Sequence, residues 1–209
     1  MSQRIATQAS FEKYRMHALE LMRIYRSDQA HCERVMRFSA QIFELLRARQ
    51  TTDSQNLHKN ESALLLRLIL AAWLHDVGHF INDVGHHKHS RYIIETARQT
   101  MDWDTTLRTD VGSLAFTHRK KAERSWLTTH FANRKELYQL SAILRIADGL
   151  DRQHADGVTI IGGQFEEENY VLQIAGLKEA YAKRMIEKKA DAWKFAFGHS
   201  LALKTLRIP

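Results

Sequence analysis

Apolar residues recur every three or four positions through the first 155 residues, a spacing typical of amphipathic helices. Ser27 or Asp28 can cap the second of these helices, and the polar stretch 50–60 interrupts the pattern as a loop. The segment from Glu61 to Gly78 is apolar nearly all round, so we expect it to be the buried central helix. The pattern predicts helices over residues 8–26, 29–47, 61–78, 86–99, 105–120 and 134–152.

The pattern changes after Gly157. Residues 158–175 read as two short strands joined by a turn that contains glycine and glutamate. A long helix over 177–197 and a closing strand over 201–206 follow, and no linker rich in proline or serine separates them from the helices. We therefore predict a mainly α fold: a helical domain, residues 1–155, with a small α+β appendage, residues 156–209, packed on it.

Composition places the chain among globular proteins. It has 209 residues, of which 44% are hydrophobic and 26% charged, and its single proline is the last residue. Cys32 is the only cysteine, so we expect no disulfide within the chain and a reducing compartment, the cytoplasm. We find no apolar run long enough to span a bilayer and no signal-peptide core, and we expect no membrane partner.

The net charge of +7 is spread along the chain. Short basic clusters occur at 119–121, 183–184 and 188–189, and we expect them to be solvated helix faces. No aromatic residues are interleaved with them and no recognition motif is present, so a nucleic-acid partner is not expected.

Five polar residues project from, or lie beside, the apolar faces of the predicted helices: His31, His75, Asp76, His118 and Asp148. A lone inward histidine is more often a hydrogen-bonded core residue, and a lone inward aspartate is commonly a cap or an ion-pair partner. Burying carboxylates is costly unless they are paired or bind a metal. Convergence on a divalent cation explains the whole set, because imidazole nitrogen and carboxylate oxygen together suit Mg²⁺ and the first-row transition metals.

These residues also carry a family resemblance. His31, then His75-Asp76 in LHDVGH, then Asp148 in RIADGLDR resemble the H…HD…D signature of the HD-domain metal-dependent phosphohydrolases. The chain is most similar to one branch, the C-terminal HD region of the exopolyphosphatase and guanosine pentaphosphatase family. The blocks that carry this similarity are AAWLHDVG at 71–78, HHKHS at 86–90, THRK at 117–120 and RIADGLDRQH at 145–154. The C-terminal strands and long helix are similar too, so the resemblance covers nearly the whole chain and implies an HD-domain helical bundle.

Full-length members of that family also carry a two-lobed, actin-like phosphatase. Those lobes need more chain than these 209 residues supply. Polyphosphate hydrolysis by the lobes therefore does not carry over, and we expect any activity to use the HD site alone.

The resemblance implies a ligand set. The metal ligands of the superfamily fall on His31, His75, Asp76 and Asp148, with His75 and Asp76 as the catalytic pair. Many HD enzymes hold a second ion, bridged to the first by the aspartate of the HD pair. The candidates for that second ion are His118 and one or more of His86, His87 and His89, with His86 favoured by spacing. The alternatives are a histidine-rich surface turn for residues 86–89 and a core histidine for His118. We expect His79 and His154 to be ordinary hydrogen-bonding residues.

Basic residues close to these ligands in sequence are candidates for binding phosphate: Lys88, Arg119, Lys120, Arg145 and Arg152. Arg145 and Arg152 are favoured because they lie about one helical turn on either side of Asp148. For each of the five, a surface salt bridge is the alternative.

The leading functional hypothesis is a metal-dependent phosphohydrolase that cleaves a phosphate ester or anhydride, including a nucleotide, by metal-activated water. One or two divalent ions are expected, and Mn, Mg, Fe, Ni, Co and Zn all remain open. The alternative is a non-catalytic HD module that binds metal and a nucleotide or polyphosphate and regulates a partner. A homodimer is compatible with the family resemblance.

Overall fold

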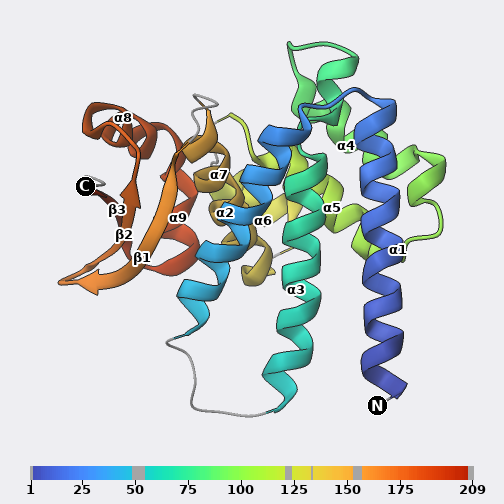
Figure 1. The fold of residues 1–209 in the computed structure, drawn as a ribbon, viewed down its shortest axis with the longest axis horizontal. Helices are drawn as coiled ribbons and strands as arrows, with labels where there is room; N and C mark the ends of the chain where they lie inside the picture. The colour runs from blue at the N-terminus through green and yellow to red at the C-terminus, as the bar shows by residue number, and fades with distance from the viewer. Residues whose placement is uncertain (1, 49–54, 121–123, 133, 153–156, 207–209) are drawn as a thin grey trace.

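A computed structural model of the chain describes residues 2–48, 55–120, 124–132, 134–152 and 157–206 (Figure 1). Over these residues the protein is mainly helical, with one small sheet near the C-terminus, which confirms the predicted fold class. The helices before the sheet are α1 (Ser2–Ile24), α2 (Gln29–Arg47), α3 (Gln55–Leu74), α4 (His86–Thr96), α5 (Thr105–Thr117), α6 (Arg124–His130) and α7 (Lys135–Asp151), together with the short 3₁₀ helices η1 (Val77–Phe80) and η2 (Arg98–Thr100). The C-terminal part consists of β1 (Thr159–Glu166), β2 (Asn169–Ala175), α8 (Glu179–Lys189), α9 (Asp191–Phe197) and β3 (Ser200–Leu206).

Two helices form the centre of the bundle. Helix α3 lies between α1 and α2 (Figure 1), and its C-terminal half, from Leu68 to Leu74, is almost wholly buried. Helix α7 packs against α2, α3, α5, α8 and α9, so nearly all of its side chains are buried as well. The expectation of a central helix at 61–78 therefore holds for its second half, and α7 shares that role.

One described segment, Glu61–Phe80, is long and apolar enough to cross a membrane by length and composition alone. Our reading of the sequence found no such run. Half of this segment is buried inside the bundle, as is usual for the core helix of a soluble protein. It is therefore weak evidence for a membrane span.

Several helix ends differ from the predicted ones. Helix α1 begins at Ser2, and α3 begins at Gln55, inside the predicted loop 50–60, whose first five residues lie outside the described part of the chain. Helix α3 ends at Leu74, so His75 and Asp76 lie in a turn before η1. Helix α6 was not predicted. Asp28 does cap α2, because its carboxylate accepts a hydrogen bond from the His31 backbone N–H at 3.0 Å.

The C-terminal part is a three-stranded sheet with two helices. Strands β1 and β2 pair antiparallel, and β3 pairs parallel to β2, so β2 is central. The predicted helix over 177–197 is two helices that meet at Ala190. Asp191 is the first residue of α9, and its Oδ1 accepts from the backbone N–H of Ala192 and from the buried guanidinium of Arg145. The domain boundary at residue 155 falls among undescribed residues and stays a prediction.

Candidate metal centre

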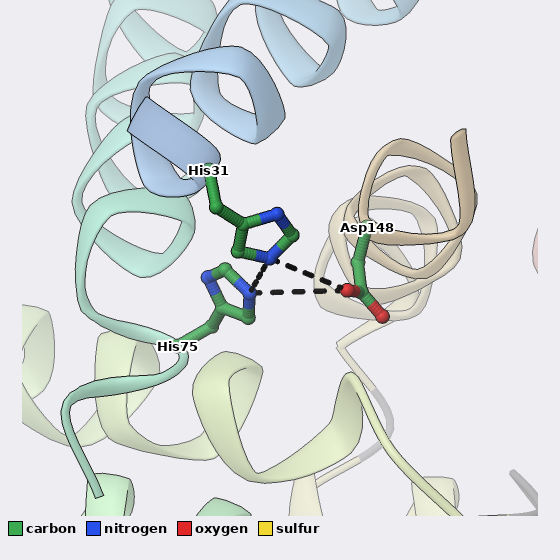
Figure 2. A group of neighbouring side chains, drawn as sticks. All are labelled: His31, His75 and Asp148. Carbon is green, nitrogen blue, oxygen red and sulfur yellow. Dashed lines mark hydrogen bonds and ion pairs between the residues drawn. The ribbon is translucent and has the colours of Figure 1, made fainter. Parts of the chain in front are cut away.

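Three helix ends and one turn bring the predicted ligands together. His31 lies in the first turn of α2, Asp148 in the last turn of α7, and His118 directly after α5. His75 and Asp76 occupy the turn after α3. Figure 2 shows His31, His75 and Asp148 pointing toward one another from these separate elements. Residues more than 100 positions apart in the sequence thus face a common point.

The first group consists of His31, His75 and Asp148, with one oxygen of Asp76. Nε2 of His31 lies 3.2 Å from Nε2 of His75 and 3.7 Å from Oδ1 of Asp148. Oδ2 of Asp76 lies 3.6 Å from the His31 nitrogen and 3.4 Å from the His75 nitrogen. Two imidazole nitrogens and two carboxylate oxygens at these separations can converge on one cation.

The second group lies on the other side of Asp76. Its Oδ1 is 3.2 Å from Nε2 of His86, 3.4 Å from Nε2 of His118 and 3.6 Å from Nε2 of His79. The His86 and His118 nitrogens are 3.1 Å apart, and their rings are stacked. This Oδ1 is buried and makes no hydrogen bond to any described residue. A buried carboxylate oxygen in that state is costly, so a cation between it and the three imidazoles would stabilise it.

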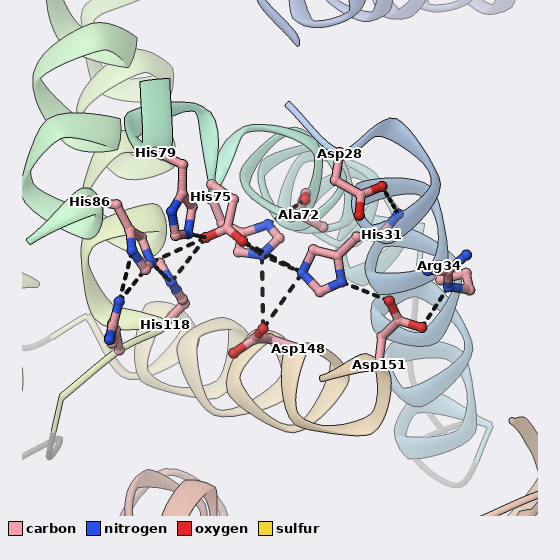
Figure 3. Close-up of polar contacts among 12 residues, drawn as sticks. Asp28, His31, Arg34, Ala72, His75, His79, His86, His118, Asp148 and Asp151 are labelled. Carbon is pink, nitrogen blue, oxygen red and sulfur yellow. Dashed lines mark hydrogen bonds and ion pairs between the residues drawn. The ribbon is translucent and has the colours of Figure 1, made fainter. Parts of the chain in front are cut away.

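The outer edge of three of these rings is held by an acceptor, and Figure 3 shows that edge of His31 facing Asp151. Nδ1 of His75 lies 2.8 Å from the carbonyl of Ala72, and Nδ1 of His118 lies 2.5 Å from the carbonyl of Ala115. Nδ1 of His31 lies 2.6 Å from Oδ2 of Asp151. An Nδ1–H that donates outward leaves the Nε2 lone pair facing inward, which is the form that binds a metal.

His79 and His86 are oriented through Asp83. Nδ1 of His79 lies 2.7 Å from the Asp83 carboxylate, and Nδ1 of His86 lies 3.1 Å from the Asp83 carbonyl. Nη1 of Arg119 also lies 2.7 Å from Nδ1 of His86. A guanidinium only donates, so Nδ1 of His86 must be unprotonated to accept from Arg119 and protonated to donate to the Asp83 carbonyl. It can therefore bond to only one of the two at a time. Nε2 of His86 is free to bind a cation once Nδ1 carries the proton and faces Asp83.

Ser90 ties the turn that carries His75 and Asp76 to α4. Its hydroxyl donates to the His75 carbonyl at 2.6 Å and accepts from the Gly78 N–H at 2.9 Å. A side chain at Gly78 would meet the His86 carbonyl oxygen at 2.1 Å and the Ser90 backbone nitrogen at 2.4 Å. Glycine at this position therefore lets the turn approach α4, and this contact joins the AAWLHDVG and HHKHS blocks.

The C-terminal part contributes a residue to the site. Lys189, at the end of α8, forms an ion pair with Oδ2 of Asp148 and donates to the His118 carbonyl at 3.0 Å. Gly149 permits this approach, because a Cβ there would lie 2.7 Å from Sδ of Met185 on α8. We expected the cluster at 188–189 to be solvated, but Lys189 is only 7% exposed. The expectation was wrong for this residue because α8 packs on the end of α7.

The electrostatics of the cluster are dominated by burial and by the two aspartates. Burial opposes the charged form of His75, but the Asp76 and Asp148 carboxylates and the hydrogen bond to the Ala72 carbonyl together outweigh it and raise the pKa of His75 to about 9. Burial and the neighbouring His75 lower the pKa of His31, and burial holds the pKa of His118 well below its ordinary value. Burial likewise opposes the charge of Asp148, yet Lys189 and the imidazoles hold the pKa of its carboxyl below its ordinary value. Burial also opposes the charge of Asp76, but His75, His86 and His118 hold the pKa of its carboxyl well below its ordinary value, so both aspartates are anionic at neutral pH, which suits a cation.

A cavity of about 260 Å³ opens onto the cluster. Two of the predicted phosphate-binding residues, Arg119 and Arg152, line it and are exposed. The others lie elsewhere. Arg145 is 1% exposed, and its guanidinium binds Asp191 and the carbonyls of Thr117 and Lys120, so it holds the segment that carries His118. The Lys120 side chain lines an adjoining cavity of about 310 Å³, and exposed Lys88 lies outside both.

Two of the four predicted second-ion histidines reach the cluster. His86 and His118 do, whereas His87 packs its ring on Phe116, with ring centroids 5.0 Å apart, and His89 is in neither group. His79, which we expected to be an ordinary hydrogen-bonding residue, joins the second group. His154 lies outside the described residues.

Sequence reasoning missed three residues of the site: His79, Asp151 and Lys189. The first two had a signal, because each stands three residues after a predicted ligand, Asp76 or Asp148, which is close to one helical turn. Lys189 had none, since its approach depends on how α8 docks on α7.

Comparison with known protein families gives a match that covers most of the chain. Residues 15–197 match the family Ppx/GppA phosphatase, domain III. The match confirms the resemblance to the C-terminal region of the exopolyphosphatase and guanosine pentaphosphatase family. A search of curated proteins gives no match.

Proposed function

The chain belongs to the Ppx/GppA phosphatase, domain III family, and from this premise we propose that it is an HD-type, metal-dependent phosphohydrolase acting on a phosphate ester or anhydride. The observation that carries the proposal is the position of Asp76. Its two carboxylate oxygens face two separate groups of imidazole nitrogens, at 3.2–3.6 Å. A carboxylate so placed can bridge two cations.

The donor set fits divalent cations. His31, His75, Asp148 and Oδ2 of Asp76 would hold one ion, and His79, His86, His118 and Oδ1 of Asp76 would hold the other. A mixture of imidazole and carboxylate suits Mn²⁺, Fe²⁺, Co²⁺, Ni²⁺ and Zn²⁺, and Mg²⁺ less well. The hydrogen-bonded Nδ1 edges support this assignment, because fixed rings are characteristic of metal ligands.

Divalent ions at such a site supply an activated water and polarise a phosphoryl oxygen. The chain itself supplies charge and orientation. Arg119 and Arg152 are the exposed guanidinium groups at the cavity wall, where they can pair with phosphate oxygens. Asp76 and Asp148 repel a phosphate dianion, so its binding depends on these cations and on the bound metal.

The test is turnover with defined metals. Metal-free protein is loaded in turn with Mn²⁺, Mg²⁺, Fe²⁺, Co²⁺, Ni²⁺ and Zn²⁺, and release of product from an aryl phosphate, an aryl phosphodiester and a nucleoside triphosphate is measured. We expect product with at least one metal and none with chelator. The Asp76→Asn variant should lose metal from both groups and lose turnover.

Asp102→Asn is the matched control, because Asp102 is an exposed aspartate whose partner is Lys13 on the surface. It should retain metal and turnover. A metal content of Asp76→Asn equal to that of the wild type would refute the ligand assignment.

A second function is favoured by the identity of the matched region. The match is to one domain of a phosphatase, domain III. If the wild type binds metal and a nucleotide or polyphosphate but releases no product with any metal, the chain is a binding module that regulates a partner.

A further inference from the structure

Lys189 differs from the two arginines that line the cavity of the cluster because it is buried. Its side chain is 9% exposed, yet it lines the cavity together with Asp76, Asp148 and the imidazoles. Arg119 and Arg152, the other cations of this cavity, are exposed. A buried ammonium beside a group of cation ligands is electrostatically unfavourable for metal binding, because it repels an incoming divalent ion.

The ammonium group of Lys189 contacts one carboxylate of the cluster and one backbone carbonyl. Nζ pairs with Oδ2 of Asp148, while Oδ1 of the same carboxylate faces the His31 and His75 nitrogens at 3.7 and 3.9 Å. Nζ also donates to the His118 carbonyl at 3.0 Å. An ammonium has three protons, so two are used by described residues and one remains for a ligand in the cavity.

Two other buried carboxylates in the described part of the chain, Asp110 and Asp151, are paired differently. Asp110 binds Arg67 and Arg134, and Asp151 binds Arg34, so both are paired with the planar guanidinium. Asp148 is paired with lysine, whose flexible stem and compact charge allow its head to change partners. The His118 carbonyl would keep the lysine head at the cavity wall during such a change.

We propose that Lys189 binds the phosphoryl group of the substrate, exchanging the Asp148 carboxylate for a phosphate oxygen when a divalent cation takes that carboxylate. This inference rests on the proposed function and assigns to α8 a substrate-binding residue. The same ammonium weakens the binding of the metal and strengthens the binding of the phosphate, and these opposite effects distinguish it from a structural ion pair.

The experiment compares Lys189→Met with the wild type. Mn²⁺ affinity is measured by electron paramagnetic resonance, and the affinity of the Mn²⁺-loaded protein for inorganic phosphate is measured by calorimetry. We expect Mn²⁺ to bind Lys189→Met as tightly as the wild type or several-fold more tightly, and phosphate to bind about tenfold or more weakly. Lys188→Met is the matched control. Lys188 is the neighbour on α8, has no described contact with Asp148, and should change neither affinity.

Equal phosphate affinity in the wild type and Lys189→Met would overturn the inference, as would a parallel loss of Mn²⁺ and phosphate binding, the result for a structural ion pair. Lys189→Gln, which can still hydrogen-bond to Asp148 and His118, serves if the Met variant fails to fold, and the same outcomes apply. A wild type that binds neither Mn²⁺ nor phosphate would refute the proposed function. If the wild type binds both ligands and the Lys189→Met and Lys189→Gln variants bind phosphate with the same affinity as the wild type, only the role of Lys189 is refuted.

Discussion

The carboxylate of Asp151 lies 2.6 Å from Nδ1 of His31, on the edge of the ring that faces away from the cluster. Asp151 is 1% exposed, and its other oxygen accepts from Nε of Arg34 at 2.5 Å. This pair fixes the tautomer and the orientation of His31, so that Nε2 points toward His75 and Asp148.

We predict that Asp151→Asn weakens metal binding at the first group by about 10- to 100-fold, because an outer carboxylate raises the basicity of a ligating histidine. Metal titration with a competing chelator measures this. Asp28→Asn is the control, since asparagine caps a helix as well as aspartate does, and it should keep the wild-type affinity. Wild-type affinity in Asp151→Asn would contradict the prediction.

Gly78→Ala should destabilise the fold by at least about 2 kcal/mol, because the new Cβ would overlap backbone atoms of α4 that cannot rotate away. Displacing the turn from α4 should also lower metal content. Gly112→Ala offers a comparison within α5, where the nearest atoms belong to the flexible Glu95 side chain at 3.1 Å. That change should be neutral or stabilising. Urea unfolding of the metal-free proteins distinguishes the two, and equal stabilities would be contrary to expectation.

Ser90→Ala should cost about 1–3 kcal/mol, because it leaves the buried N–H of Gly78 without its acceptor and removes the donor to the His75 carbonyl. Thr96→Ala, on the same helix, removes only an exposed hydroxyl that donates within α4 and should change stability little. Thermal unfolding of both variants measures the difference. A Ser90→Ala protein as stable as Thr96→Ala would show that the turn does not depend on this hydroxyl.

His87 should make the protein sensitive to acid. Burial lowers the pKa of His87 to about 4 from an ordinary value of 6.5, so the neutral ring favours the folded state. The unfolded chain therefore binds the proton first. The stabilisation is complete above pH 6.5 and is lost as the pH falls from 6.5 toward 4.

Between pH 7.5 and pH 5 this histidine should account for about 2 kcal/mol of lost stability. His87→Phe removes the titrating group at a site that already packs on Phe116. Over the same pH interval, His87→Phe should lose about 2 kcal/mol less of its free energy of unfolding than the wild type loses. Because the change in stability with pH is compared, any packing cost of the substitution that does not depend on pH cancels. The same pH dependence in the variant and the wild type would refute the role of His87.

The fold class and most of its elements could be predicted from the sequence, because hydrophobic periodicity reports which face of each segment is buried. His31, His75, His118 and Asp148 were predicted to turn inward for the same reason, and all four lie in the cluster or beside it. The errors are helix ends, the unpredicted helix α6 and the break at Ala190 within the predicted helix over 177–197. The apolar pattern continues past Leu74, but the chain turns there because Gly78 and Ser90 bring it against α4.

The inward position of each ligand was thus determined by its own helix. The distances between ligands, the inclusion of His79 and the placement of Lys189 were decided by tertiary packing. His31 and Asp148 are 117 positions apart, and no local pattern specifies that their helix ends meet with atoms 3.7 Å apart. Periodicity encodes the direction of a side chain relative to its own axis, whereas the angle and offset between helices depend on the contacts of all the side chains between them. Lys189 shows this most clearly. The sequence predicts an exposed lysine, but the packing of α8 on α7 at Gly149 buries its side chain beside Asp148.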